Sequence, residues 1–380
     1  MNSKRVLIAC DTPRTILDFR GKLIEAMSRK NKVYVFTPVI AQDFVRKKLE
    51  SFGVTIIENN LNGSNVSVLS DLKYIFKLFG VIRSLKPDVF FPYTLKPVIY
   101  GSLVANFCKV KLVAPMLSGL GYNFADTQSK NTFVKKITRV LLRKSLDKKD
   151  KVRLILQNKD DYSTLLSQKI IDEKSSAYVV NGSGVDLTHY DYSLPNTENI
   201  SFLMIARLIN AKGIREYYEA AKSIKMQFPE IKFKLIGPYD DNIDSIDQEL
   251  YHEILNSGVV NYIGEVTDVR PHISNSSVVV LPSYYGEGVP RCILEAMAMG
   301  RPIITSDSVG CRETVNLRSG STNGFLVPVK DVPSLIAKME YFILNTDDII
   351  RFGRNGRKYA EEKFDVLLVN NQMLKIMELQ

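Results

Sequence analysis

Residues 282–296 read PSYYGEGVPRCILEA, a stretch that places two glutamates, Glu287 and Glu295, eight positions apart. The preceding residues 278–281 read VVVL, and such a β-branched run is typical of a buried parallel strand. Residues 292–299 are apolar and favour a helix. The pattern therefore predicts a strand, a glycine-flanked loop that holds Glu287, and a helix that holds Glu295 about two turns later.

The loop and the helix start together suit an anionic or hydroxyl-rich ligand. Backbone amides at a helix N-terminus, here those of Gly288 and Val289, attract anions. An ionised carboxylate only accepts hydrogen bonds, and it can take two donors at once. The stretch therefore predicts a site for a polar, phosphorylated ligand.

Other segments extend this pattern along the chain. They are NGSGVD at 181–186, ARL at 206–208 followed by Lys212-Gly213, FKLIG at 233–237, VNYIG at 260–264, RPIIT at 301–305 and NGFLV at 323–327. Together with the E-x7-E spacing they resemble, in order, retaining glycosyltransferases of family 4, which have the GT-B fold. The resemblance is close over residues 179–330 and loose over the first 178 residues.

The resemblance implies an α/β chain of the GT-B class, in which two Rossmann-like, doubly wound domains face a central cleft. Strand-like and helix-like segments also alternate along the whole sequence, as doubly wound sheets require. At 380 residues the chain is long enough for two domains. We expect an acceptor-binding domain at 1–185, onto which the last helix at about 366–380 crosses back, a linker at 191–199, and a nucleotide-sugar-binding domain at 191–365.

Two cations follow the apolar strand expected at 201–206. Arg207 and Lys212 lie at its carboxyl end, where open α/β sheets bind ligands. They can neutralise a leaving nucleoside diphosphate, so we expect no metal ion and no cofactor for that task. Taken alone, the pair also fits surface charges at a helix start. By resemblance, Arg207, Lys212 and Glu287 form the catalytic set, and Glu287 orients hydroxyls of the donor sugar.

The resemblance also implies a set of donor-binding residues. Glu295 accepts hydrogen bonds from the ribose hydroxyls, and the nucleobase, expected to be uracil, lies near the end of the strand at 260–264. The implied set is Glu295, Gly288, Val289, Ile263 and Gly264. Many family members have glycine where this chain has Pro290, which lacks a backbone donor and makes the sugar harder to predict.

Two loops of the first domain are candidates for the acceptor or the transferred sugar. YTLKPVIYG at 93–101 and LSGLGYN at 117–123 resemble loops of a subgroup that builds bacterial surface polysaccharides. Many family members have a histidine near the first loop, but the three histidines of this chain fall outside both. The expected sugar-facing residues are Thr94, Lys96, Gly119 and Gly121.

Charge is concentrated in the first half of the chain. Residues 1–190 carry a net charge of +15, whereas residues 191–380 carry −5. The densest basic stretch, Lys130 to Arg153, holds ten basic side chains, with apolar residues at helical spacing. Such a segment can lie on an anionic membrane surface, or it can be a core helix with a solvated outer face. We expect the membrane, and no motif predicts binding to nucleic acid.

Composition agrees with an enzyme of this size, which we expect in the cytoplasm. Hydrophobic residues make up 45% of the chain, and no apolar run is long enough for a membrane span. The apolar run near the N-terminus is shorter than that of a signal peptide. Four cysteines at irregular spacing suit a reducing compartment.

The resulting prediction is a retaining hexosyltransferase at the inner face of the bacterial cell membrane. It would move an N-acetylhexosamine or hexose from a UDP-sugar to an undecaprenyl-diphosphate-linked saccharide, giving an α-linkage in O-antigen or capsule assembly. A nucleotide-sugar epimerase of the same fold would act without an acceptor. A non-catalytic scaffold would dock on anionic lipid and turn over no donor. Both alternatives stay open at this point.

Overall fold

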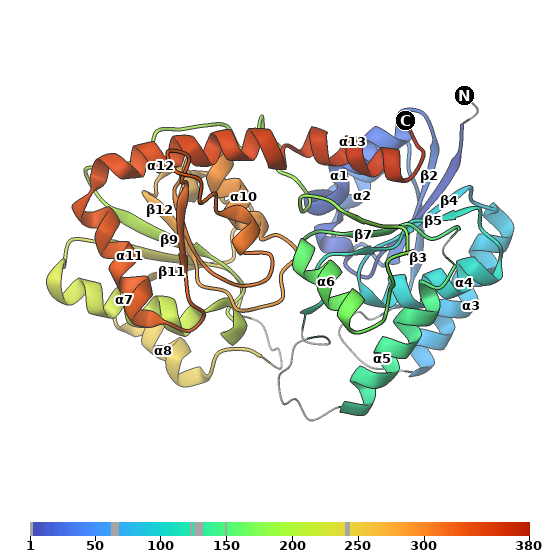
Figure 1. Ribbon diagram of the computed structural model, residues 1–380, viewed down its shortest axis with the longest axis horizontal. Helices are drawn as coiled ribbons and strands as arrows, with labels where there is room; N and C mark the ends of the chain where they lie inside the picture. Colours follow the sequence, from blue (N-terminus) through green and yellow to red (C-terminus); the bar gives the residue numbers. More distant parts are fainter. Residues whose placement is uncertain (1–2, 62–67, 122–123, 125–131, 149, 240–243) are drawn as a thin grey trace. The chain divides into compact units, whose positions relative to one another are not determined.

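The computed structural model describes residues 3–61, 68–121, 124, 132–148, 150–239 and 244–380 (Figure 1). The chain divides into two compact units, the first formed by Met1–Ser183 with Leu367–Gln380 and the second by Gly184–Val366. Residues 191–199, the expected linker, lie inside the second unit.

The first unit is a parallel sheet with helices on both faces. Its five-stranded sheet has the order β3-β2-β1-β4-β5, and a second sheet has the order β6-β7-β8. The strands are β1 Arg5–Ala9, β2 Lys32–Pro38, β3 Thr55–Asn59, β4 Val89–Pro92, β5 Leu112–Val113, β6 Met116–Leu117, β7 Leu154–Leu156 and β8 Ala177–Val179. The helices are α1 Ile16–Ser28, α2 Asp43–Ser51, α3 Val68–Leu85, α4 Ser102–Phe107, α5 Thr132–Ser145, α6 Lys159–Ser167 and α13 Val366–Ile376, with short turns at Pro13–Thr15 and Pro97–Gly101.

Strand β1 shows why this sheet is buried on both sides. Successive side chains of a strand point to opposite faces. Val6 and Ile8 lie in one core cluster with residues of α1, α2 and α13, while Leu7 and Ala9 lie in another with residues of α3, α4, α5 and α6. A continuous apolar run such as Val6–Ala9 is therefore what a parallel sheet covered by helices requires.

The second unit has the strand order β11-β10-β9-β12-β13-β14, all parallel. This is the 3-2-1-4-5-6 order of a Rossmann fold. The strands are β9 Ser201–Ile205, β10 Lys232–Ile236, β11 Asn261–Gly264, β12 Val278–Leu281, β13 Ile303–Ser306 and β14 Gly324–Val327. The helices are α7 Ile214–Gln227, α8 Gln248–Asn256, α9 Arg270–Ser274, α10 Arg291–Ala298, α11 Val332–Leu344 and α12 Thr346–Tyr359, with short turns at Asn210–Lys212, Arg312–Thr314 and Ala360–Phe364. Figure 1 shows α7 beside α11.

The order of strands reverses between β9 and β12, which are neighbours in the sheet. In open α/β sheets such a switch point, at the carboxyl ends of the strands, is where ligands bind. The expected α/β class with two Rossmann-like domains is confirmed.

A buried arginine ties several parts of the second unit together. Arg301 is fully buried, and its guanidinium donates to the carbonyl oxygens of Ser193, Ile273, Ser274 and Met299, at 2.5–2.9 Å, and to Ser193 Oγ at 2.7 Å. Three of these carbonyls lie at the C-terminal ends of α9 and α10, which leave acceptors unpaired. Burial lowers the pKa of Arg301 to about 10. The contacts fix the segment around Ser193 against α9 and α10.

The chain enters and leaves the second unit at adjacent positions. Val185 and Asp365 form a parallel bridge, in which the Val185 amide donates to the Phe364 carbonyl at 2.8 Å and the Val366 amide donates to the Val185 carbonyl at 3.0 Å. The first and last residues of this unit therefore lie side by side.

Candidate functional site

Two loops meet at the switch point of the second unit. Lys212 ends the turn after β9, and Gly213 follows it with φ +79°. A Cβ on Gly213 would lie 2.3 Å from the carbonyl oxygen of Pro282, in the loop after β12. Only glycine permits this approach with that backbone conformation. The sequence thus brings the β9 and β12 loops into direct contact.

The loops carry a buried ion pair. Lys212 Nζ contacts Glu287 Oε1, and the two side chains are only 16% and 13% exposed. Ser283 Oγ donates to the same carboxylate oxygen at 3.2 Å, and the Lys212 ammonium lies 5.4 Å from the centre of the Tyr285 ring. Burial opposes the charge of Lys212, but attraction to Glu287 outweighs it and the pKa is raised. Lys212 is therefore ionised at neutral pH.

Arg207 lies at the same edge of the sheet, two residues after β9, and it is exposed. Burial first, and then the Glu287 carboxylate, raise the pKa of Tyr285, while Lys212 and Arg207 oppose them. The three charged residues therefore act on one aromatic side chain. Two cations and one carboxylate gather where a charged ligand would meet the sheet.

Glu295 lies on α10 and is 8% exposed. Its Oε1 accepts from the Tyr190 hydroxyl at 2.9 Å and from Arg291 Nε at 3.0 Å. Burial and the Glu295 charge raise the pKa of Tyr190. Two donors therefore hold one oxygen of this carboxylate in a fixed position.

Gly288 and Val289 are buried just before α10. The loop after β13 approaches them closely, because a Cβ on Gly310, at φ +78°, would lie 2.4 Å from the Gly288 carbonyl oxygen. A third loop of the carboxyl edge thus supports the segment that holds Glu287.

Ile263 and Gly264 end β11 and are partly buried. The carbonyl of Gly264 accepts from the Gly237 amide at 2.9 Å. Because β11 is two strands from β9, these residues are about 10 Å from that strand at the usual spacing of parallel strands. A nucleoside could span that distance along the carboxyl edge.

The first unit has its own switch point, between β1 and β4. Asp11 follows β1, and Thr94 follows β4 with φ +71°, a left-handed conformation that is strained for a β-branched residue. Burial raises the pKa of Asp11, although a hydrogen bond from Thr94 counteracts it. Asp11 and Thr94 therefore form a polar pair at the carboxyl edge.

Lys96 forms an ion pair with Asp71 of the first unit. Its Nζ lies 2.9 Å from Asp71 Oδ1, and the Tyr100 hydroxyl donates to Asp71 Oδ2 at 2.9 Å. The Lys96 side chain is 18% exposed. The structure thus places Lys96 beside the α3 carboxylate, in the same loop as Thr94.

The glycine-rich loop after β6 is anchored on α6. Gly119 and Gly121 have φ of 120° and 56°. The buried Asp161 carboxylate has its pKa raised to about 7 by desolvation, which hydrogen bonds from Asn158 and the Leu120 backbone counteract. Tyr122 and Asn123, which complete the predicted loop, lie outside the described residues.

Of the basic segment expected at Lys130 to Arg153, Thr132–Ser145 form α5, while Lys130 and Lys149 lie outside the described residues. Leu142 and Leu146 are buried, but Val134, Ile137 and Val140 are exposed at 37%, 42% and 47%. Along the described ranges, no helix combines the length and hydrophobicity of a membrane span.

Several residues of these sites were not predicted from the sequence. Tyr190 is 105 positions from Glu295, and no local pattern connects them. Ser283 and Tyr285 lie within residues 282–296, where the two glutamates carry the recognisable spacing. Asp11 could have been predicted as a site residue, since it lies two residues after the first strand of a doubly wound sheet, at the edge where ligands bind.

Comparison with known proteins identifies the chemistry. Residues 190–359 match the family model described as Glycosyl transferases group 1. The chain is 26% identical, over 96% of either chain, to the N,N'-diacetylbacillosaminyl-diphospho-undecaprenol alpha-1,3-N-acetylgalactosaminyltransferase of Campylobacter jejuni. The chain is a glycosyltransferase.

Two further comparisons agree with this conclusion. The UDP-Gal:alpha-D-GlcNAc-diphosphoundecaprenol alpha-1,3-galactosyltransferase of Escherichia coli is 26% identical, over 80% of this chain and 78% of the other. The solved structure of Anabaena HepE in complex with UDP-glucose superposes with a TM-score of 0.77, at 17% identity, over 99% of this chain and 100% of the other. At that identity the structural likeness establishes the fold, which is GT-B.

Proposed function

We propose that this glycosyltransferase is a retaining enzyme of family 4. It transfers a hexose or N-acetylhexosamine from a UDP-sugar to an undecaprenyl-diphosphate-linked saccharide, with an α-linked product in bacterial surface polysaccharide assembly. The observation that carries the proposal is the buried Lys212–Glu287 pair at the switch point of the second unit.

Lys212 and Glu287 suit the two ends of the bond that breaks, which joins the sugar to the diphosphate. The ammonium of Lys212 and the guanidinium of Arg207 stabilise the charge that develops on the departing diphosphate. The Glu287 carboxylate, held by Lys212 and Ser283, is the kind of acceptor that sugar hydroxyls bind. Because the two cations perform the task of a metal ion, we expect transfer to continue when divalent cations are chelated.

The proposed reaction step is a same-face substitution. The bond between the anomeric carbon and the diphosphate oxygen breaks, and UDP leaves. The acceptor oxygen bonds to that carbon on the same face. Its proton passes to an oxygen of the leaving diphosphate, so that no protein nucleophile or base is needed.

The proposed donor and acceptor are supported by two separate observations. Glu295 is positioned by Tyr190 and Arg291 to accept hydrogen bonds, as ribose hydroxyls require. The printed names of the Campylobacter and Escherichia relatives describe acceptors linked to diphospho-undecaprenol.

A lipid-linked acceptor implies work at a membrane surface, and α5 suits that task. Exposed Val134, Ile137 and Val140 lie on a helix whose last turn holds Arg143 and Lys144. Apolar side chains flanked by cations are typical of helices that lie on anionic lipid. We therefore propose a peripheral location on the inner face of the cell membrane.

Nucleotide release by the purified protein tests this function. UDP- and GDP-sugars are supplied with and without a lipid-linked monosaccharide, and chelator is added in a parallel series. We expect UDP release that needs the acceptor and survives chelation, and an α-linkage in the product by NMR. Release without acceptor would favour an epimerase or hydrolase, and no release from any donor would favour a scaffold.

Variants separate catalysis from folding. E287Q keeps the shape of Glu287, and K212M removes the cation; each is expected to lower kcat by about 10- to 1,000-fold, as other single electrostatic contacts do. K358M is a matched control, because the Lys358 side chain is 75% exposed. Near-normal turnover in both site variants would contradict the assignment.

A further inference from the structure

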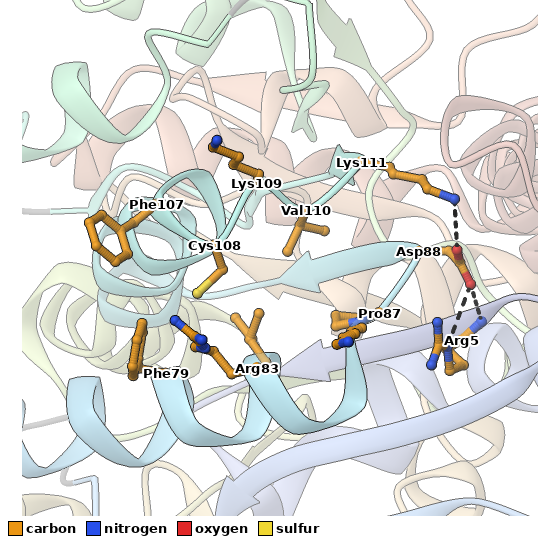
Figure 2. Close-up of a pocket in the computed structure, with 12 residues that line it drawn as sticks. Arg5, Phe79, Arg83, Pro87, Asp88, Phe107, Cys108, Lys109, Val110 and Lys111 are labelled. Atoms are coloured by element: carbon orange, nitrogen blue, oxygen red, sulfur yellow. Dashed lines mark hydrogen bonds and ion pairs between the residues drawn. The ribbon is translucent and has the colours of Figure 1, made fainter.

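A cavity of about 530 Å³ lies in the first unit, away from the switch point between β1 and β4 (Figure 2). Arg5 opens β1, Asp88 precedes β4 and Lys111 precedes β5, so the cavity lies at the amino edge of the sheet. Thr94 follows the opposite end of β4, and four strand residues separate the two ends by about 13 Å. The cavity is therefore distinct from the proposed substrate loops.

The cavity is strongly basic. Its lining includes five cations and a single carboxylate, Asp88. The cations are Arg5, Arg83, Lys86, Lys109 and Lys111. Asp88 accepts from the Arg5 amide at 2.9 Å and lies 3.4 Å from Lys111, contacts that Figure 2 shows as dashed lines.

The C-terminal ends of nearby helices neutralise only part of this positive charge. Lys86 and Lys109 follow the C-termini of α3 and α4, where each helix dipole places about half a negative charge. One carboxylate and two helix ends thus offset about two of the five positive charges. A net charge of about +3 remains in one cavity, which favours an anion such as a phosphate.

The wall of the cavity is aromatic and continues into an exposed apolar stripe. The Phe79 and Phe107 rings lie 6.0 Å apart, the Arg83 guanidinium lies 5.6 Å from the Phe79 ring, and Phe107 is 76% exposed. Towards the start of α3, Leu69, Leu72 and Phe76 are 74%, 44% and 72% exposed. The spacing of Leu69, Leu72, Phe76 and Phe79 puts them on one side of α3.

An apolar stripe that ends in a basic cavity fits the boundary between the acyl chains and headgroups of a bilayer. Arginine and lysine near such a boundary interact with anionic headgroups, while aromatic and aliphatic side chains enter the interface. Helix α4 contacts both α3 and α5, and Figure 1 shows the three helices as neighbours.

We propose that this cavity binds the phosphate headgroup of an anionic phospholipid and so holds the α3 face on the membrane. The inference shares the membrane setting of the proposed function, but it does not depend on the sugar chemistry. The ligand is the bilayer itself rather than the acceptor lipid.

Two lysines of the cavity can be replaced without an expected loss of folding, so weaker membrane binding by the variant would not be caused by misfolding. Lys86 and Lys109 have φ of 45° and 58°, a conformation that favours glycine. The double variant K86G/K109G therefore removes two cations and is expected to keep or raise the thermal midpoint. The control K330G/K358M removes two lysines from the second unit, and Lys330 has φ of 61°.

Co-sedimentation with phosphatidylcholine vesicles that contain phosphatidylglycerol measures the effect. At about 1 kcal/mol for each lysine near an anionic surface, K86G/K109G is expected to bind about thirtyfold more weakly, and the control to change less than about threefold. Transfer to a short-chain, water-soluble acceptor is expected to be normal in the double variant, so failure of the transferase proposal would show there instead.

Three results would overturn the inference. The first is equal vesicle binding by K86G/K109G and the wild type. The second is binding of glycerol 3-phosphate, lost in the double variant, without vesicle binding, which would indicate a soluble phosphate ligand. The third is self-association through the α3 face without vesicle binding, measured by sedimentation velocity.

Discussion

Replacing Arg301 by methionine is expected to destabilise the second unit severely. The side chain is fully buried, and its five donor contacts end on carbonyl or hydroxyl oxygens of Ser193, Ile273, Ser274 and Met299. Methionine fills similar space but donates to none of them. The variant R301M therefore tests how far one guanidinium holds the fold together.

The magnitude depends on which acceptors lose their only donor. Ile273 also accepts from Ser276, and Met299 also accepts from the Ser193 amide. Among the residues that the structure describes, the Ser193 and Ser274 carbonyls have no second backbone or side-chain donor. Each orphaned carbonyl costs about 1–3 kcal/mol, and removing a buried charge offsets part of that. We expect a loss of about 3 kcal/mol, or about 6–12 °C in the unfolding midpoint of a unit this size.

Urea unfolding followed by far-ultraviolet circular dichroism measures this loss, and hydrogen exchange of residues 190–200 localises it. R301K keeps the charge but has fewer donors, so its loss is expected to be intermediate. R215M is the matched control, because Arg215 is 50% exposed and pairs with an exposed Asp247, and its change is expected to stay within about 0.5 kcal/mol. An R301M midpoint equal to that of R215M would refute the reasoning.

Three further predictions concern the sites. R207A is expected to lower kcat by about 10- to 1,000-fold with an unchanged thermal midpoint, since Arg207 is exposed; near-normal turnover would remove it from the catalytic set. Y190F is expected to lower the free energy of unfolding by about 1–2 kcal/mol, because the Tyr190 hydroxyl bonds a buried carboxylate, and to raise the KM for the donor; an unchanged KM would separate Glu295 from donor binding. Burial raises the pKa of Asp161 from 3.8 to about 7, so its stabilising contribution is complete below pH 4 and is lost as the pH rises to about 7. D161N is expected to flatten that pH dependence, by at most about 4 kcal/mol, and parallel urea midpoints for both proteins between pH 4 and 8 would contradict it.

The strands were predictable where a local pattern encodes them. The apolar residues 6–9, which include Val6 and Ile8, predict a strand after Arg5, and β1 occupies 5–9. Residues 111–115 likewise predict one strand from the sequence, but the segment divides into β5, which pairs with β4, and β6, which pairs with β7. The amides alternate between the two neighbouring strands, since Ala114 donates to Phe90 while Val113 donates to Lys151. Pro115 interrupts the ladder on the β7 side, because it has no amide hydrogen.

The candidate site was predictable where its residues follow neighbouring parallel strands, because the carboxyl ends of such strands meet at one edge of the sheet. Lys212 and Glu287 are 75 positions apart, yet each follows a strand whose neighbour in a doubly wound sheet can be inferred. The contact of Tyr190 with Glu295 lacks such a rule, because it joins an irregular segment to the middle of a helix. Long-range side-chain contacts of this kind depend on packing that no local periodicity records.

The bridge between Val185 and Asp365 has a consequence for how such enzymes diversify. One uninterrupted stretch of the gene encodes the second unit, and both of its ends emerge at adjacent points. Recombination at those two points would exchange the whole unit as a cassette while the flanking codons stay in place. A lineage could thereby exchange, in one event, the unit that we propose binds the donor sugar and retain the unit that we propose binds the acceptor.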